Sequence, residues 1–335
     1  MIDNMIRETQ VSVYCLAYNH EKYIREALEG FVKQKTNFRY EVYVHDDAST
    51  DKTADIIKEY AEKYPEIIIP VLETENQYSK GNVRVSEIVY PLLKGKYVAV
   101  CEGDDYWTDE SKLQQQYDAM ENNPECSICA HYADLYNVTT GKIDGYYPKM
   151  YKVQEGILNK EIELKIALLD MFQLSTCFFR KKIYDEYIQN KPHYATIYPV
   201  GDVPLWLYFC AYGSMYFIEK HMSVYRSGIE GSWTLRIRDN RSKMIIHTKA
   251  VINSLELYKD FLKHNYKEID YAIRYTKIKK AFLEDDYRLI INKEYRDIFE
   301  TFSFKIRMKC LFFGRFPELL GIYYKIKNLI LGENS

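Results

Sequence analysis

The chain has 335 residues, of which 47% are hydrophobic and 28% charged, and its formal net charge is −2. This composition is typical of a globular protein rather than a disordered one, and the near-neutral charge argues against a nucleic-acid partner. The sequence has no run of about 18 apolar residues, so no membrane-spanning helix is predicted. Because residues 1–10 lack a signal-peptide core and the seven scattered cysteines favour reduced thiols, we predict a cytoplasmic protein.

Apolar strand-like runs and helical stripes alternate over residues 1–125. Strands are predicted at Val11–Tyr18, Tyr40–His45, Ile67–Leu72 and Tyr97–Cys101, and helices at Glu21–Gln34, Asp51–Tyr64, Val83–Leu93 and Ser111–Asn122. This order predicts an α/β fold with a mostly parallel central sheet and helices on both of its faces.

The chain changes character twice after this region. Residues 126–238 mix strands with a Gly-, Tyr- and Lys-rich hairpin stretch and a short apolar helix at Pro204–Tyr212. Beyond Arg238 glycine and proline become rare, and Lys-, Glu- and Tyr-rich helical segments continue to the end. We therefore predict a catalytic domain at 1–238, with halves 1–125 and 126–238, and a helical C-terminal region at 239–335.

Carboxylates gather directly after two of the predicted strands. Asp46 and Asp47 follow the second strand, and Asp104 and Asp105 follow the fourth. Ligands of open α/β sheets bind at the carboxyl ends of the strands, so both pairs are expected at one crevice. Clustered carboxylates share protons or hold a cation, and oxygen ligands suit Mg²⁺ or Mn²⁺ bridging to a diphosphate. Gly103, just before the second pair, is expected to let the backbone turn there.

Simpler interpretations of the same acids stay open. Asp46 and Asp47 can cap the helix that follows them, and Asp202 can be the N-cap of the helix at Pro204–Tyr212. A third acidic run, at 284–286, lies inside a predicted surface helix and is assigned no function. His20 and His45 lie beside the predicted crevice, where each can either contact a diphosphate or serve as a loop cap or a strand-end core residue.

Three stretches carry a resemblance to a known family: VSVYCLAYNHEKYIREALEGFVKQ, YEVYVHDDASTDKTADII and GKYVAVCEGDDYW. In this order and spacing they resemble the inverting family 2 glycosyltransferases of the GT-A fold, of the type that builds bacterial surface polysaccharides. The resemblance covers residues 1–235, is strongest over 1–120 and does not extend to the tail.

The resemblance implies a role for each of several residues. Ala17, Tyr18 and Asn19 would contact the nucleotide base, with the Tyr18 ring stacked on it. Asp47 would hydrogen-bond the base, supported by Asp46.

It also implies the residues that do the chemistry. Glu102, Gly103, Asp104 and Asp105 match the family's DxD-type motif, in which Asp104 approaches the ribose, the sugar or the metal and Asp105 binds the metal. Glu102 stands where many relatives have Asp. Asp202 matches the catalytic base, and Gly201 stands where the family often has Glu. Arg226 and Trp233 match a loop that closes over diphosphate and acceptor.

The implied activity is hexosyl or glycosyl transfer with inversion, from a nucleotide-sugar donor, preferably UDP-linked, to a saccharide or lipid-linked glycan. A sugar nucleotidyltransferase is the first alternative, although AYNHEKY lacks the glycine-rich phosphate loop of such enzymes. The second is a nucleotide-sugar-binding protein without activity. The tail at 303–332 interleaves Lys and Arg with apolar side chains, which suits either peripheral contact with an anionic membrane or a helix packed on the protein with a basic outer face.

Overall fold

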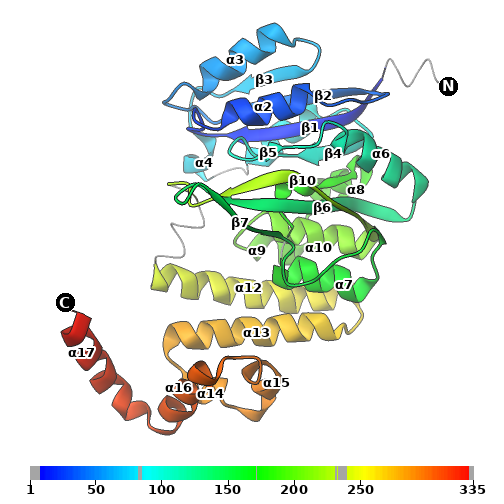
Figure 1. The fold of residues 1–335 in the computed structure, drawn as a ribbon. Helices are drawn as coiled ribbons and strands as arrows, with labels where there is room; N and C mark the ends of the chain where they lie inside the picture. The colour runs from blue at the N-terminus through cyan, green and yellow to red at the C-terminus, as the bar shows by residue number, and fades with distance from the viewer. Residues whose placement is uncertain (1–7, 82–84, 171, 231, 233–239, 332–335) are drawn as a thin grey trace. The chain divides into compact units, whose positions relative to one another are not determined.

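The computed structural model describes residues 8–81, 85–170, 172–230, 232 and 240–331. The chain forms two compact units, one of residues 1–195 and 200–230 and the other of residues 196–199 and 231–335 (Figure 1). No helix in the described ranges combines the length and the apolar character needed to cross a membrane.

One sheet runs through the first unit, with the strand order β3-β2-β1-β4-β9-β6-β10-β5, while β7 pairs with β6 and β8 with β10. Its strands are β1 (Thr9–Ala17), β2 (Arg39–Asp46), β3 (Ile68–Leu72), β4 (Tyr97–Val100), β5 (Tyr106–Trp107), β6 (Cys126–Asn137), β7 (Lys142–Tyr147), β8 (Gly156–Ile157), β9 (Phe178–Arg180) and β10 (Ser214–Ser227). The β3-β2-β1-β4 part is parallel, as predicted. Because β9 runs antiparallel to both β4 and β6, the rest of the sheet is mixed.

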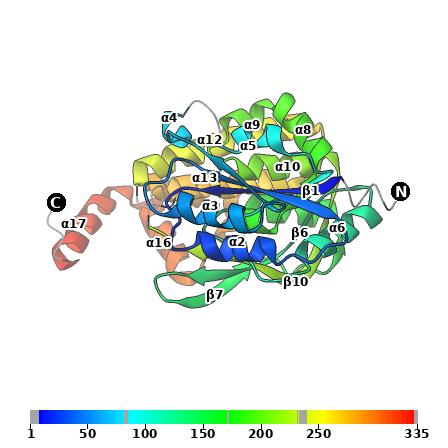
Figure 2. The same cartoon turned by 90° about the horizontal axis from the view of Figure 1, so that it is seen from above.

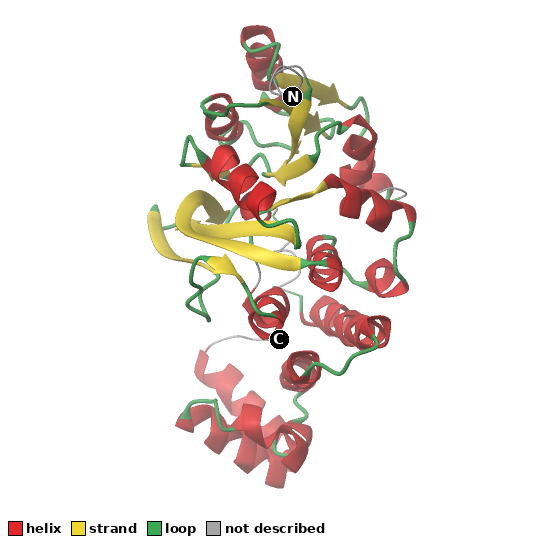
Figure 3. Ribbon diagram, turned by 90° about the vertical axis from the view of Figure 1, so that its right-hand side faces the viewer, coloured by secondary structure: helices red, strands yellow, loops and turns green. Residues whose placement is uncertain are grey.

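Helices flank this sheet on both sides, as predicted (Figures 2 and 3). They are α2 (Ile24–Val32), α3 (Thr53–Lys63), α4 (Gln77–Lys80), α5 (Val85–Val89), α6 (Lys112–Asn122), α7 (Lys160–Lys165), α8 (Lys181–Gln189), α9 (His193–Ile197) and α10 (Asp202–Tyr212). The single helix predicted at Val83–Leu93 is instead α5 followed by a 3₁₀ turn at Tyr90–Leu92, because Pro91 has no backbone N–H to continue an α-helix.

The core of the first unit is built from the buried apolar side chains of the central strands and one face of α2. The completely buried members include Val11, Val13 and Cys15 of β1, Val42 and Val44 of β2, and Ile24, Ala27, Leu28 and Phe31 of α2. Such burial on both faces is typical of parallel strands covered by helices. This packing, with β1 between β2 and β4, fixes the position of the strand end from which the loop after β1 begins.

The second unit is helical, which confirms the predicted helical C-terminal appendage. Its helices are α12 (Arg241–Leu262), α13 (Lys267–Glu284), α14 (Tyr287–Ile290), α15 (Arg296–Phe299), α16 (Phe304–Arg315) and α17 (Leu320–Leu331). The acidic run at 284–286 ends one helix and begins the next, rather than lying inside a helix as predicted. Asp285 closes α13 in a left-handed conformation (φ 57°), and the Asp286 carboxylate accepts the Leu289 N–H at 3.1 Å to cap α14.

Candidate active site

Two acidic segments leave the sheet on either side of the end of β1. The Asp47 N–H donates to the Ala17 carbonyl at 3.0 Å, and the Gly103 N–H donates to the Leu16 carbonyl at 2.9 Å. Since β1 lies between β2 and β4, these bonds place the 46–47 and 102–105 segments at the same carboxyl edge. The sheet thus brings the two predicted acid clusters together.

The loops after β1 and β2 are tied to each other by side chains. The Asn19 N–H donates to Ser49 Oγ at 2.8 Å, the Thr50 N–H donates to Asn19 Oδ1 at 2.8 Å, and the Ser49 N–H donates to Asp46 Oδ2 at 3.0 Å. Asn19 and Ala48 both adopt left-handed backbone conformations, with φ of 56° and 58°. Non-glycine residues rarely adopt this conformation, and such strain is concentrated at functional sites. By accepting the Ser49 N–H, Asp46 helps to fix the conformation of the loop after β2.

Asp47 is buried and its carboxylate holds the start of α4. Its two oxygens accept the N–H groups of Gln77 at 2.7 Å and Tyr78 at 3.0 Å. The rings of Tyr18 and Tyr78, by contrast, are 45% and 58% exposed. The edge thus combines a fixed, buried carboxylate with two accessible aromatic rings, of which the sequence analysis identified only Tyr18.

The 102–105 segment brings three carboxyl groups close together in the chain. Asp105 is buried, and burial, together with Asp104 and Glu102, raises the pKa of its carboxyl well above the ordinary value. Burial, Asp104 and Asp202 raise the pKa of Glu102 to about 8. Asp202, the first residue of α10, is one of the charges that raise this pKa, so it acts electrostatically on the 102–105 segment.

Gly103 permits a close approach rather than an unusual turn. The backbone does turn here, as predicted, since the Asp105 N–H donates to the Glu102 carbonyl at 3.1 Å, but the φ of Gly103 is not in the left-handed region. A Cβ at this position would lie 2.8 Å from Ile24 Cδ1, 3.0 Å from His20 Nδ1 and 3.1 Å from Ala17 Cβ. Only glycine lets the acidic segment lie this close to the end of β1.

The two histidines beside the edge differ in environment. His20 is half-buried, with Nε2 3.8 Å from Asp104 Oδ2, and its Nδ1 has no hydrogen-bond partner among the described residues. His45 is completely buried on β2 with Nε2 3.5 Å from Glu73 Oε1, and burial lowers its pKa. Of the two, His20 is the one that lies against the acidic segment.

Arg226 of β10 braces the acidic segment against α2. Its backbone N–H donates to Asp105 Oδ1 at 2.9 Å, and its guanidinium donates to the Asp104 carbonyl at 2.6 Å and to the Glu26 carboxylate. The guanidinium also lies 4.4 Å from the centre of the Tyr106 ring. The sequence analysis missed Glu26 and Tyr106, although Tyr106 directly follows the acid pair. Trp233, which was predicted alongside Arg226, lies outside the described residues.

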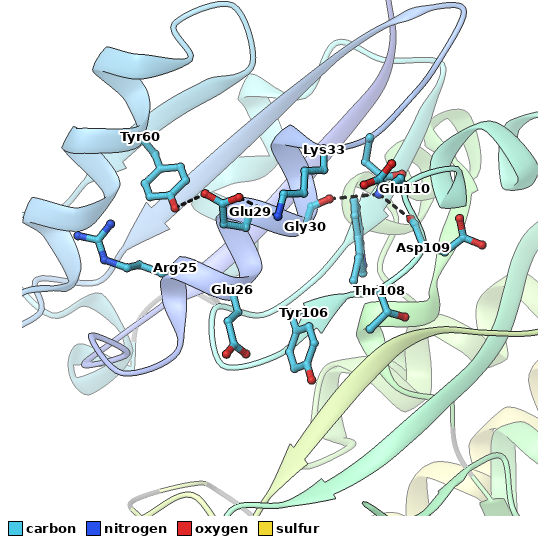
Figure 4. A pocket seen from close by; sticks show the side chains of 12 residues that line it. Arg25, Glu26, Glu29, Gly30, Lys33, Tyr60, Tyr106, Thr108, Asp109 and Glu110 are labelled. Atoms are coloured by element: carbon cyan, nitrogen blue, oxygen red, sulfur yellow. Dashed lines mark hydrogen bonds and ion pairs between the residues drawn. The ribbon is translucent and has the colours of Figure 1, made fainter.

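A groove of about 500 Å³ runs along the outer face of α2 and ends near this brace, at Glu26 and Tyr106 (Figure 4). Its charged side chains pair with their neighbours: Glu29 accepts the Tyr60 hydroxyl at 2.6 Å and lies 3.0 Å from Lys33 Nζ. Because Glu29 is already paired, we assign no ligand to this groove and describe it as a surface groove beside the 102–105 segment.

The acidic segment suits a cation that takes few protein ligands. In the described ranges, no group of three or more His, Cys, Asp or Glu side chains is arranged to hold a metal. Mg²⁺ and similar ions at phosphate sites usually take only one or two carboxylates and fill the shell with water and phosphate oxygens. The mutual repulsion of Asp104 and Asp105 is the kind of arrangement that such a cation relieves.

Comparison with solved structures defines the class of fold. The chain resembles Staphylococcus aureus TarS 1–349 in complex with UDP-GlcNAc, with a TM-score of 0.56 and 16% identity over 86% of this chain and 78% of that one. It also resembles a mannosyltransferase from Pyrobaculum calidifontis in complex with GDP-Man and Mn²⁺, with a TM-score of 0.52 and 16% identity over 93% and 87% of the two chains. The fold is the GT-A fold of glycosyltransferases.

Sequence comparison defines the family. Residues 12–188, more than half of the chain, match the family model described as glycosyl transferase family 2, and the chain belongs to this family. An uncharacterised protein of Mycobacterium tuberculosis is 31% identical over 258 residues, which cover 77% of this chain and 70% of that protein. The Escherichia coli UDP-Glc:α-D-GlcNAc-diphosphoundecaprenol β-1,3-glucosyltransferase WfaP is 27% identical over 162 residues, 48% of this chain and 60% of that protein.

Proposed function

We propose that this protein transfers one sugar, with inversion, from a nucleotide-diphosphate donor to a saccharide or lipid-linked glycan acceptor. The observation that carries the proposal is that backbone hydrogen bonds to Ala17 and Leu16 hold Asp47 and the 102–105 segment at the same carboxyl edge of the sheet. A UDP-linked donor and a lipid-linked acceptor are the preferred substrates, because the name of the E. coli relative specifies both. We place the reaction in the cytoplasm, at the inner face of the membrane.

The donor would be bound mainly by the loops after β1 and β2. The exposed Tyr18 ring offers a face on which a base can stack, with Ala17 and Asn19 beside it. Each carboxylate oxygen has a further lone pair beyond the N–H bond that it accepts, so Asp47 can also accept from the base. Asp46 holds the Ser49 loop in place and acts through position rather than contact.

Asp202 would serve as the general base. A sugar hydroxyl is a weak nucleophile and becomes acidic only as it attacks, so a positioned carboxylate can take its proton in the transition state. Attack from the side opposite the diphosphate inverts the anomeric carbon. Asp105 and Asp104 would hold Mn²⁺ or Mg²⁺, with Asp104 also near the ribose or sugar. When bound, such an ion offsets the charge that develops on the leaving diphosphate.

Arg226 and Trp233 are proposed to close over the diphosphate and the acceptor. Arg226 is currently held by Glu26 and the Asp104 carbonyl, so closure would exchange the Glu26 contact for a phosphate oxygen. Until that exchange, Arg226 keeps the acidic segment in position.

Donor binding can be tested with a panel of nucleotide sugars, measured by protection against thermal unfolding with and without Mn²⁺. We expect a UDP-sugar to protect, and Mn²⁺ to increase the protection. Asp105→Asn keeps an oxygen for the Arg226 N–H but weakens the metal ligand, so it should remove the Mn²⁺-dependent part. Asp118→Asn, on the exposed side of α6, is the matched control and should behave as wild type. Protection by no nucleotide sugar contradicts the proposal, and unchanged affinity of Asp105→Asn in Mn²⁺ places the ion elsewhere.

A further inference from the structure

Helix α16 is apolar on two sides, and the core of the second unit uses only one of them. Cys310 and Phe313 are buried in that core. On the other side, Phe304, Met308 and Leu311 are 71%, 48% and 46% exposed. Spacings of four and three residues place these three side chains along one face of the helix.

The exposed apolar surface continues past the end of α16. Phe312, Phe316, Ile322 and Tyr323 are all exposed. The first turns of α17 are held in place, because the Tyr323 ring centre lies 5.1 Å from that of Phe313 and the Tyr324 hydroxyl donates to Asp285 at 2.8 Å. Figure 1 shows α17 leading away from the end of this helix. Exposed apolar side chains gathered on α16 and early α17 are unusual for a protein surface and mark an interaction site.

The same segment carries a strong excess of positive charge. Residues 303–325 contain five basic residues (Lys305, Arg307, Lys309, Arg315 and Lys325) and one acidic residue, Glu318. Among the residues that the structure describes, none of the five basic side chains forms an ion pair. Several cations of the earlier helices in this unit do form ion pairs, as in Lys259–Asp270 at 2.7 Å, Arg274–Asp297 at 2.6 Å and Lys280–Glu284 at 2.5 Å.

We propose that this surface, the α16 face (Phe304, Met308, Leu311, Phe312, Phe316, Ile322 and Tyr323 with the five cations), docks on an anionic lipid bilayer. The apolar side chains enter the headgroup layer, and the ammonium and guanidinium groups pair with lipid phosphates. Charge complementarity favours this occupant over a second copy of the chain, because two α16 faces would bring like charges together. Membrane docking would bring the enzyme to a lipid-linked acceptor, and this functional meaning rests on the proposed function. Lipid binding itself requires neither donor nor acceptor.

The test is co-sedimentation of the full chain with vesicles of phosphatidylcholine alone and of phosphatidylcholine mixed with phosphatidylglycerol. We expect binding to the anionic vesicles only, and its weakening as salt is added. The double variant Met308→Gln/Leu311→Gln should bind at least about tenfold more weakly. Lys305→Gln/Arg315→Gln should lose about 25-fold, at about fivefold for each charge removed.

Matched controls change the same residue types outside the α16 face. Ile246→Gln alters an exposed apolar side chain of α12, and Lys58→Gln/Lys94→Gln removes two surface cations of the first unit. Both should bind vesicles as wild type does, and thermal unfolding by circular dichroism should confirm that every variant is folded.

Three results would overturn docking. They are an absence of binding to anionic vesicles, equal binding by the α16-face and control variants, and a wild-type dimer that Met308→Gln/Leu311→Gln abolishes without any change in vesicle binding. Because no sugar transfer is measured, failure here is distinct from failure of the transfer proposal, which would appear as a loss of nucleotide-sugar binding.

Discussion

Substituting Gly103 by alanine tests the close packing that places the acidic segment. The added Cβ would meet three atoms at 2.8 to 3.1 Å, which is shorter than ordinary van der Waals contact. The nearest of them, Ile24 Cδ1, is the tip of a side chain that can rotate, whereas Ala17 Cβ is fixed by β1. Overpacking of this kind costs about 1–3 kcal/mol, and partial relief by Ile24 leads us to expect a loss of about 1–2 kcal/mol in the free energy of unfolding.

The remaining strain should move the acidic segment and weaken Mn²⁺-dependent donor binding. We expect about a tenfold loss of donor affinity, which corresponds to about 1.4 kcal/mol. Urea denaturation measures the stability, and titration calorimetry with the protective nucleotide sugar measures the affinity. Gly321→Ala is the control, because a Cβ there meets nothing within 4 Å and alanine favours a helix, so stability should rise by up to about 1 kcal/mol with donor affinity unchanged. If Gly103→Ala matches wild type in both measurements, the close approach at the end of β1 is wrong.

Two further substitutions test the core of the first unit. Gly95→Ala should destabilise the fold by about 3 kcal/mol or more in urea denaturation. The added Cβ would lie 2.5 Å from the Ser12 N and 2.7 Å from the Val11 C, and these backbone atoms cannot rotate away. A denaturation midpoint equal to that of wild type would refute this packing. Lys112 is completely buried, and burial lowers its pKa from 10.5 to about 8, so the unfolded chain binds more protons between these values and stability should rise with pH through that window. The full penalty of about 3 kcal/mol is present below pH 8. Lys112→Met should therefore flatten the pH dependence between 8 and 10.5, and an unchanged slope would show that another group titrates there.

The parallel half of the fold could be predicted because each of its strands is a short apolar run followed by a helix with one apolar face. The second half could not, because the apolar run at Phe178–Arg180 carries no signal of the direction in which a strand lies. β10 begins with the strand-like run Ser214–Ile218, and this pattern alone predicts a strand that ends too early. Its register shifts at Ile218 and His221, and polar residues there hide the continuation to Ser227.

The positions of the two acid pairs could be predicted because each pair lies at the end of a strand that neighbours β1 in the sheet. Acids that directly follow β2 and β4 must meet at the edge beside β1, and residue spacing reveals this. The Arg226–Glu26 contact joins residues 200 positions apart and leaves no local pattern. The steric need for glycine at position 103 could not be predicted either. It arises from the side chains of Ile24 and His20, which lie next to Gly103 only in the folded protein.

The central claim is that Asp202 acts on the acceptor beside a donor held at the acidic edge. The most direct test compares donor affinity with the rate of sugar transfer in Asp202→Asn. Removing a general base lowers the rate by about 10²–10⁴-fold, and an amide of the same shape should leave donor affinity within about twofold of wild type. We predict this separation of binding from turnover. Transfer at the wild-type rate would show that another group takes the proton, and the proposed mechanism would then be wrong.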